Sequence, residues 1–308
     1  MTGRHPFGTH SRVGFIGLGV MGGGMSRCLL RKGHRLTVHA RRSKVAQDFA
    51  QAGAQVAGNP AALGACELVF LSLPDASAVE EVLFGPEGLA AALQPGSCIV
   101  DTSTISAQSA RDIGNRLAQR GVVFLDAPVS GGQQGAESGT LGAMVGGPKD
   151  VVDACRDVMG AFCKTITHVG ELGAGQTVKA CNQVAVAGAL LGVADAMALA
   201  RKEGVDLALM REVLLGGSAR SFSLEKHGPR IIDGSYAPGF RARLMLKDLR
   251  LALEAARAAG AVLPATEVAE RLLGQLCESG RADWDWSALA LLAQQRSGLP
   301  IPDAPERT

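Results

Sequence analysis

The first half of the chain alternates short apolar runs with segments of helical periodicity. Apolar runs of about four to eight residues, bounded by turn residues, are typical of strands buried on both faces of a sheet. Seven runs are expected to be strands: Val13–Gly17, Leu36–His39, Leu68–Leu73, Cys98–Asp101, Val122–Asp126, Gly142–Val145 and Thr165–Val169. Because helical patterns separate most of them, we predict a doubly wound, mainly parallel α/β sheet.

The pattern changes after Gly173-Ala174-Gly175. Strand signals disappear there, and Ala/Leu-rich helical patterns follow, the first over about 176–203. Later Gly and Pro residues divide this half into several helices of ordinary length, so we predict an all-α C-terminal domain beyond a boundary near residue 172. The expected divisions are a flexible tail at 1–11, the α/β domain at 12–172, the helical domain at 173–297 and a frayed tail at 298–308.

Composition narrows the class of protein. Of 308 residues 47% are hydrophobic and 19% are charged, and the formal net charge is +2, so neither nucleic acid nor a membrane is an expected partner. The longest apolar stretch, Val184–Ala200, is interrupted by Asp195 and is too short to span a bilayer, so a buried helix is expected. The polar N-terminus indicates no signal peptide. Seven cysteines without a Cys-x-x-Cys pair indicate reduced thiols in a cytoplasmic protein and no metal site.

The first expected strand runs into a glycine-rich turn. The sequence Val13-Gly14-Phe15-Ile16-Gly17-Leu18-Gly19-Val20-Met21-Gly22 leads from a strand through Gly-x-Gly-x-x-Gly into a helical pattern. Gly17 permits the tight turn, Gly19 lets the backbone approach a pyrophosphate, and Gly22 allows the helix to pack closely on the strand. Glycine-rich turns also occur without a ligand. The strand before and the helix after favour a dinucleotide site at Gly17, Leu18, Gly19, Val20, Met21 and Gly22.

The end of the second strand indicates which dinucleotide binds. An acidic residue there accepts hydrogen bonds from the ribose of NAD, whereas arginines accommodate the 2′-phosphate of NADP. Here His39 is followed by Ala40-Arg41-Arg42-Ser43, and no acid appears before Asp48. Arg41 and Arg42 therefore favour NADP over NAD, although both could also be solvated turn residues.

Two further segments carry groups that could act on a small acid. Ser130, Gly131 and Gly132 follow the fifth strand at the carboxyl edge, where a hydroxyl and unhindered N–H groups could hold a carboxylate. Loops of this kind also favour Ser and Gly for purely structural reasons. Lys179 shares one helix face with Asn182 and Gln183. A lysine can exchange a proton with a carbonyl oxygen, but a lone helical lysine is more often solvated.

Five motifs together are similar to those of the β-hydroxyacid dehydrogenase family. They are Gly14–Gly22, Asp101-Thr102-Ser103-Thr104, Asp126-Ala127-Pro128-Val129-Ser130-Gly131-Gly132, Gly173–Gly175 with Lys179–Gln183, and Lys247-Asp248-Leu249. The resemblance implies a Rossmann domain, an all-helical second domain, and a homodimer or homotetramer built through the C-terminal helices. It also implies Lys179 as the catalytic acid and base, Ser130, Gly131 and Gly132 as carboxylate binders, Asn182 and Gln183 as groups that orient the substrate, and Thr104 and Lys247 near the nicotinamide.

Some positions depart from the family pattern. Many members have two asparagines where this chain has Asn182-Gln183; this form, and the segment Asp283–Leu289, resemble tartronate semialdehyde reductases. NAD users of the family carry Asp where this chain has Ala40. Three arginines also stand where relatives often have Gly or Asp: Arg220, Arg241 and Arg243. They could bind a second acidic group of the substrate or make surface or subunit contacts.

These observations predict an NADP-dependent oxidoreductase that interconverts a small β-hydroxy acid and its semialdehyde by hydride transfer. Tartronate semialdehyde, 3-hydroxyisobutyrate, and glyoxylate or succinic semialdehyde are the substrates that the resemblance suggests. An imine reductase is one alternative, but members of that group generally lack the lysine found here at position 179. A catalytically silent NADP-binding scaffold is another, and the presence of both Lys179 and Ser130 argues against it.

Overall fold

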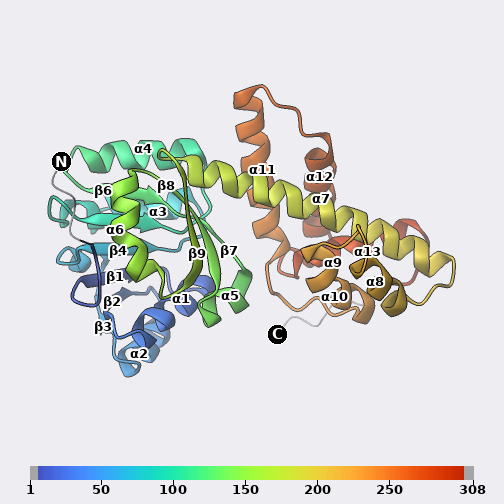
Figure 1. Cartoon of the computed structure of the whole chain (residues 1–308), viewed down its shortest axis with the longest axis horizontal. Coiled ribbons are helices and arrows are strands. Elements are labelled where there is room, and N and C mark those ends of the chain that lie inside the picture. The colour runs from blue at the N-terminus through green and yellow to red at the C-terminus, as the bar shows by residue number, and fades with distance from the viewer. Residues whose placement is uncertain (1–5, 302–308) are drawn as a thin grey trace. The chain divides into compact units, whose positions relative to one another are not determined.

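The computed structural model describes residues 6–301, which divide into two compact units between Lys179 and Ala180 (Figure 1). The expected boundary lay near residue 172, at the start of the connecting helix. The division into compact units falls within that helix.

A mainly parallel sheet forms the centre of the first unit, as the sequence predicts. Its strands are β1 (Arg12–Ile16), β2 (Arg35–His39), β3 (Gln55–Val56), β4 (Leu68–Leu71), β5 (Cys98–Asp101), β6 (Val123–Asp126), β7 (Val129–Ser130), β8 (Leu141–Gly146) and β9 (Cys163–Gly170). The spatial order is β3-β2-β1-β4-β5-β6-β8-β7, with β9 beside β8. Strands β1 to β6 pair in parallel, whereas β8 is antiparallel to β6 and β7. All seven expected strands are present; the two-residue strands β3 and β7 were not expected.

Helices cover both faces of this sheet (Figure 1). They are α1 (Val20–Arg31), α2 (Ser43–Gln51), α3 (Ala76–Phe84), α4 (Ala107–Ala118), α5 (Gly132–Ser138) and α6 (Lys149–Met159), with short 3₁₀ helices at Pro60–Leu63 and Leu89–Ala91. Strand β4 shows why its sequence is a continuous apolar run. Leu68 and Phe70 belong to one buried cluster, whereas Val69 and Leu71 belong to another. Successive side chains point to opposite faces, and both faces are covered.

The strand register brings the loops of the expected site to one edge of the sheet. Ile16 pairs with His39 and Leu71, Leu71 pairs with Asp101, and Asp101 pairs with Asp126. The carboxyl ends of five neighbouring strands are therefore level. The loops that follow them emerge side by side, which is the edge where open α/β sheets bind ligands.

The second unit is helical, as predicted. Helix α7 (Ala174–Lys202) starts in the first unit and continues into the second, where it is followed by α8 (Leu207–Leu215), α9 (Phe222–Lys226), α10 (Gly228–Asp233), α11 (Ala242–Ala259), α12 (Pro264–Leu276), a π-helical turn at Cys277–Arg281, a 3₁₀ helix at Trp286–Leu289 and α13 (Ala290–Arg296).

Helix α7 is less buried than expected. Along one face of the helix, Gln183, Ala187, Leu190, Ala194 and Met197 are buried. This spacing of three and four residues turns a single face to the helical core. On the other side, Leu199 is 64% exposed. By length and composition alone α7 could cross a membrane, and 39% of its most apolar window is buried in the structure.

Parts of both expected tails are packed. Phe7 is 9% exposed, and its N–H donates to the carbonyl of Ala154 in α6. At the other end the N–H of Leu299 donates to the carbonyl of Gln294, and Ile301 packs against the helical core. Residues 7–11 and 298–301 are thus not free segments, and the remainder of both predicted tails lies outside the described residues.

All seven cysteines are free thiols. Five are buried: Cys28, Cys66, Cys98, Cys155 and Cys163. Cys277 is half-buried and Cys181, on α7, is exposed. Within residues 6–301, no group of three or more His, Cys, Asp or Glu side chains could hold a metal ion.

Candidate active site

The glycine-rich turn has the geometry that a dinucleotide requires. Gly17 has a φ of 97°, and a Cβ there would overlap the carbonyl oxygen of Ser72. A Cβ on Gly22 would overlap the carbonyl oxygen of Gly17, so α1 can approach the turn only with glycine at this position. Gly19 is the N-cap of α1, and a Cβ there would enter open space. Helix α1 has no acidic residue in its first turn and no side-chain cap, so its start suits an anion.

The other expected residues of this turn differ in exposure. Leu18 is buried, Met21 is half-buried, and Val20 is 59% exposed. Arg41 and Arg42 lie beyond the neighbouring strand β2; both are exposed, and Arg42 is the N-cap of α2. Helix α2 also has no acidic residue in its first turn. The two arginines thus stand at the same sheet edge as the glycine turn, with no carboxylate in the first turn beside them.

Thr104 lies in the loop that follows β5. Gln176, which is 3% exposed, fixes this loop from the first unit's part of α7. Its amide nitrogen donates to the carbonyl of Ser103 at 2.8 Å, and its amide oxygen accepts from the N–H of Ile105 at 3.2 Å. The two bonds hold the main chain on both sides of Thr104, which is itself half-buried.

Lys179 contacts the loop that carries the expected carboxylate binders. It is 8% exposed, and its ammonium donates a hydrogen bond of 2.9 Å to the carbonyl oxygen of Val129. Ser130 is the next residue, and Gly131 and Gly132 have φ values of 131° and 63°, which only glycine adopts readily. Through its bond to Val129, Lys179 therefore lies next to the segment that begins with Ser130, although 49 positions separate the two residues in sequence.

Asp126 holds the start of α7 beside this loop. The carboxylate is 0% exposed and accepts from the N–H groups of Gly173 and Gln176, each at 2.8 Å. Burial raises its pKa to about 6, and the main-chain hydrogen bonds act in the opposite direction. The sequence showed Asp126 only as part of a motif, without a role.

The remaining expected residues lie in the second unit and converge on Asp248. Gln183, which is 4% exposed, donates to Asp248 at 2.6 Å and also contacts the sulfur of Met245 at 3.5 Å. The amide of Asn182 donates to Gln183 at 2.8 Å. The ammonium of Lys247 lies 3.2 Å from the other oxygen of Asp248, which is 3% exposed.

Arg220, Arg241 and Arg243, for which the sequence allowed either a substrate contact or a surface contact, make ion pairs at the surface of the second unit. Arg243 and Arg241 lie 2.7 and 3.4 Å from Asp283, and Arg220 lies 3.9 Å from Glu225. All are at least 46% exposed at the side chain. Side chains in such pairs are already neutralised, which favours the surface reading over a substrate contact.

Sequence reasoning missed three polar residues that hold this arrangement together: Asp126, Gln176 and Asp248. A signal existed for the first. Asp126 ends an apolar strand, so its carboxylate is expected to be buried and to need hydrogen-bond donors. The turn Gly173-Ala174-Gly175, at the start of a helix, offers main-chain N–H groups of that kind. Asp248 appeared only within the motif Lys247-Asp248-Leu249, and its bond to Gln183 spans 65 positions. Gln176 has no local signal, because its side-chain partners lie 71 and 73 positions away.

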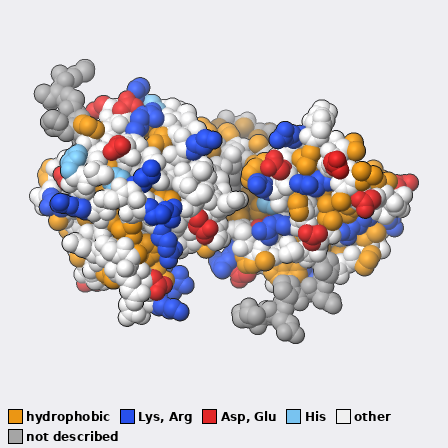
Figure 2. All heavy atoms as spheres, turned by 60° about the horizontal axis from the view of Figure 1, so that its bottom comes forward, with side chains coloured by type: hydrophobic (Ala, Val, Ile, Leu, Met, Phe, Trp, Pro, Cys, Tyr) orange, Lys and Arg blue, Asp and Glu red, His pale blue; other side chains and the backbone are white. Residues whose placement is uncertain are grey.

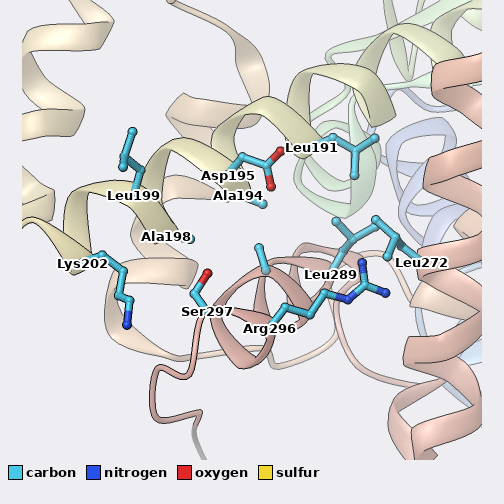
Figure 3. A pocket seen from close by; sticks show the side chains of 11 residues that line it. Leu191, Ala194, Asp195, Ala198, Leu199, Lys202, Leu272, Leu289, Arg296 and Ser297 are labelled. Atoms are coloured by element: carbon cyan, nitrogen blue, oxygen red, sulfur yellow. The ribbon is translucent and has the colours of Figure 1, made fainter.

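A separate hollow of about 380 Å³ lies in the second unit between α7, α12 and the C-terminal helices (Figure 3). Leu191, Ala194, Leu272 and Leu289 line it, and Asp195, Lys202 and Arg296 stand around it. It contains none of the expected site residues. Figure 2 shows a face on which acidic, basic and apolar side chains are interspersed.

Two family models together match nearly the whole chain. Residues 12–170 match the NAD binding domain of 6-phosphogluconate dehydrogenase, and residues 173–293 match the NAD-binding domain of NADP-dependent 3-hydroxyisobutyrate dehydrogenase. Among curated relatives, 2-hydroxy-3-oxopropionate reductase of Escherichia coli is 40% identical over 279 residues, which are 90% of this chain and 95% of that protein. The 3-hydroxyisobutyrate dehydrogenase of Pseudomonas aeruginosa is 38% identical over 270 residues, 84% of this chain and 90% of that protein.

Solved structures agree. The 3-hydroxyisobutyrate dehydrogenase of Salmonella typhimurium aligns with a TM-score of 0.84 at 29% identity, covering 92% of this chain and 99% of that chain. Fold, glycine turn and relatives define an NAD(P)-dependent oxidoreductase that acts on CH–OH donors. The chain belongs to the β-hydroxyacid dehydrogenase family. Imine reductase from Myxococcus stipitatus, at 18% identity and a TM-score of 0.63, shares the fold alone.

Proposed function

We propose that the protein interconverts a small β-hydroxy acid and its semialdehyde with NADP, and that Lys179 is the proton donor and acceptor. One observation carries the proposal. The ammonium of Lys179 is held inside the fold at the Val129 carbonyl, next to Ser130 and the Gly131-Gly132 turn. A proton donor and a carboxylate-binding turn are thus neighbours, as reduction of a carboxylate-bearing aldehyde requires.

Each residue has a distinct task in this proposal. Ser130 and the N–H groups after it bind the substrate carboxylate. Lys179 donates a hydrogen bond to the aldehyde oxygen and transfers its proton as negative charge develops there; in the oxidative direction it accepts the proton. Asn182 and Gln183 follow Lys179 by three and four positions on α7 and orient the substrate. Bound nicotinamide supplies or accepts the hydride.

The preference for NADP rests on the turn after β2. Arg41 and Arg42 are exposed there, and the first turn of α2 contains no carboxylate that would repel a 2′-phosphate. Relatives include both kinds of cofactor use: one curated relative is an NAD-dependent L-serine dehydrogenase of P. aeruginosa, and one structural neighbour was solved with NADP⁺. We therefore assign the preference to these two side chains rather than to the family.

The test is steady-state kinetics with NADPH and with NADH over a panel of semialdehydes, glyoxylate and cyclic imines. We expect turnover of a carboxylate-bearing aldehyde with NADPH, and no turnover of imines. Lys179→Ala should lower kcat by at least about 10³-fold while NADPH binding changes little. Lys202→Ala, an exposed lysine on the same helix, is the control and should remain active. Turnover retained by Lys179→Ala would remove the lysine from the mechanism.

We also propose a cytoplasmic homodimer or homotetramer that associates through the C-terminal helices. Large apolar side chains of the second unit support it because they are exposed in the single chain: Leu199, Leu209, Val213 and Phe222, at 58 to 67% exposure. Light scattering coupled to size-exclusion chromatography measures the mass directly. A monomer at micromolar concentration would contradict this part of the proposal.

A further inference from the structure

Asp126 connects the end of a strand to the start of the helix that carries Lys179. It is the last residue of β6, and its two carboxylate oxygens accept from the N–H groups of Gly173 and Gln176, each at 2.8 Å. These donors belong to the turn that begins α7. Lys179 follows Gln176 by three residues, less than one helical turn. The carboxylate therefore fixes where the helix begins and how it is rotated about its axis.

The same aspartate also begins the loop that Lys179 contacts. Val129, whose carbonyl accepts from the Lys179 ammonium at 2.9 Å, is three residues after Asp126. The loop after β6 is thus bonded to α7 at two places. Two hydrogen bonds join Asp126 to the first turn of the helix, and one joins Lys179 to Val129. A shift of the helix start moves the Cα of Lys179 relative to Val129, so the lysine side chain has to change its rotamer or lose this hydrogen bond.

The carboxylate of Asp126 packs tightly against two glycines, Gly146 and Gly175. A Cβ on Gly146 of β8 would overlap one carboxylate oxygen, and a Cβ on Gly175 would lie 2.8 Å from the other. The groups that face it from α7 are main-chain N–H groups. On the neighbouring strand β5, the buried carboxyl Asp101 pairs with Asp126 in the strand register, and its Oδ1 accepts from the N–H of Ser103. Arg111 of α4 stands beside Gly173, where a Cβ would lie 2.6 Å from its guanidinium. A negative charge at a helix N-terminus is also favoured by the helix dipole.

We propose that Asp126 is a positioning residue for catalysis: it locks the first turn of α7 in the register that places the Lys179 ammonium at the Val129 carbonyl and beside the substrate. The inference rests on the proposed role of Lys179. Asp126 acts through main-chain donors and through Lys179, and it does not itself touch the reacting atoms.

Protonation of Asp126 should weaken the lock. The oxygen that takes the proton becomes a weaker acceptor than a carboxylate oxygen, so one of the two hydrogen bonds is weakened. Burial raises the pKa of Asp126 to about 6, which puts this change within reach of an ordinary pH profile. In the reductive direction Lys179 must carry its proton, so titration of the lysine lowers the rate only as the pH rises. A fall of kcat below about pH 6 that is absent from Asp126→Asn would therefore report Asp126.

The experiment compares the wild-type protein with Asp126→Asn in the reductive direction, with a semialdehyde substrate and NADPH, from about pH 5 to 8. We expect wild-type kcat to fall on the acid side with a midpoint near pH 6. The variant should lose about 10- to 100-fold in kcat at neutral pH, lack the acid limb, and change KM and NADPH binding by less than about threefold. Asp206→Asn is the control, because the exposed Asp206 also accepts a main-chain N–H at a helix start, that of Leu209 in α8, far from Lys179 in sequence; its kcat should stay within about twofold.

The outcomes separate this inference from the proposed function. If Lys179→Ala keeps full turnover, the proposed function fails first. If Lys179→Ala is inactive but Asp126→Asn keeps wild-type kcat, or keeps the acid limb, the positioning role is wrong and the lysine mechanism stands. Should Asp126→Asn not fold, the wild-type profile still decides, because a kcat that is independent of pH between about 5 and 7 contradicts the inference.

Discussion

Gln183 donates a hydrogen bond of 2.6 Å to Asp248, which lies 65 residues further along the chain. Both side chains are buried, and the other oxygen of Asp248 lies 3.2 Å from the ammonium of Lys247. The carboxylate of Asp248 therefore connects Gln183 of α7 with Lys247 of α11, and the family resemblance assigns these two partners to substrate and cofactor.

The junction should contribute measurable coupling energy. Asp248→Ala leaves a buried amide and a half-buried ammonium without this acceptor, so we expect it to lower the free energy of unfolding by about 2 to 3 kcal/mol. A double-mutant cycle with Gln183→Ala, measured by urea denaturation, should give a coupling energy of about 1 kcal/mol or more. Asp283→Ala removes a mostly exposed carboxylate from surface ion pairs and should change stability by less than about 0.5 kcal/mol. If the effects of Asp248→Ala and Gln183→Ala on the free energy of unfolding simply add, the hydrogen bond between them contributes no coupling energy.

Adjacent glycines of α1 should respond in opposite ways to alanine. A Cβ on Gly22 would overlap the carbonyl oxygen of Gly17, so Gly22→Ala should push α1 off the strand and abolish NADPH binding. A Cβ on Gly23 would have no neighbour nearer than 3.6 Å. Gly23→Ala should therefore fold, and it should gain up to about 1 kcal/mol from helix propensity. Fluorescence titration with NADPH and thermal unfolding check both. Normal NADPH affinity in Gly22→Ala would contradict the close-packing argument.

Arg41 and Arg42 should determine the cofactor preference. The double variant with alanine at both positions loses the two guanidiniums that we propose bind the 2′-phosphate, so kcat/KM for NADPH should fall about 10- to 100-fold while that for NADH changes little. The ratio of the two values is the quantity to measure, because it cancels effects on folding. Arg35→Ala, at the opposite end of β2, is the control. An unchanged ratio would mean that these arginines are only solvated turn residues.

Stability and activity should move in opposite directions in weak acid. Burial raises the pKa of Asp126 from its ordinary value of 3.8 to about 6, so the folded protein binds this proton more tightly than the unfolded chain does. The contribution of Asp126 to stability is therefore fully present below about pH 4 and is lost as the pH rises through 6, a change of about 3 kcal/mol. Urea denaturation of the wild type and Asp126→Asn between about pH 4 and 7 isolates it. The unfolding free energy of the wild type minus that of the variant should fall as the pH rises toward neutral, and a constant difference would argue against the raised pKa.

The glycine turn could be predicted from sequence because its interactions are local. Gly17 and Gly22 are five positions apart, and the strand before them and the helix after them have regular apolar periods. Seven strands could be predicted for the same reason. Strand β7 could not, because two residues, Val129 and Ser130, carry no period, and they pair with β8 only after the chain has turned through α5.

The support of the lysine could not be predicted. The position of Lys179 depends on main-chain groups near residues 126, 129 and 173, and helical spacing says nothing of which strand end the helix start will meet. The burial of α7 was overestimated because an apolar sequence does not reveal how many neighbours a helix has. Phe7 was assigned to a free tail because a single aromatic residue in a polar segment has no periodic partner in sequence.

The seven cysteines differ in exposure, which allows one of them to be labelled selectively. Cys181 is exposed two residues beyond Lys179, Cys277 is half-buried, and the other five cysteines are buried. A maleimide dye added to the native protein should therefore attach first at position 181, on the face of α7 that the solvent reaches. Its emission would then follow ligand-induced rearrangement around that helix in real time, without any engineered cysteine.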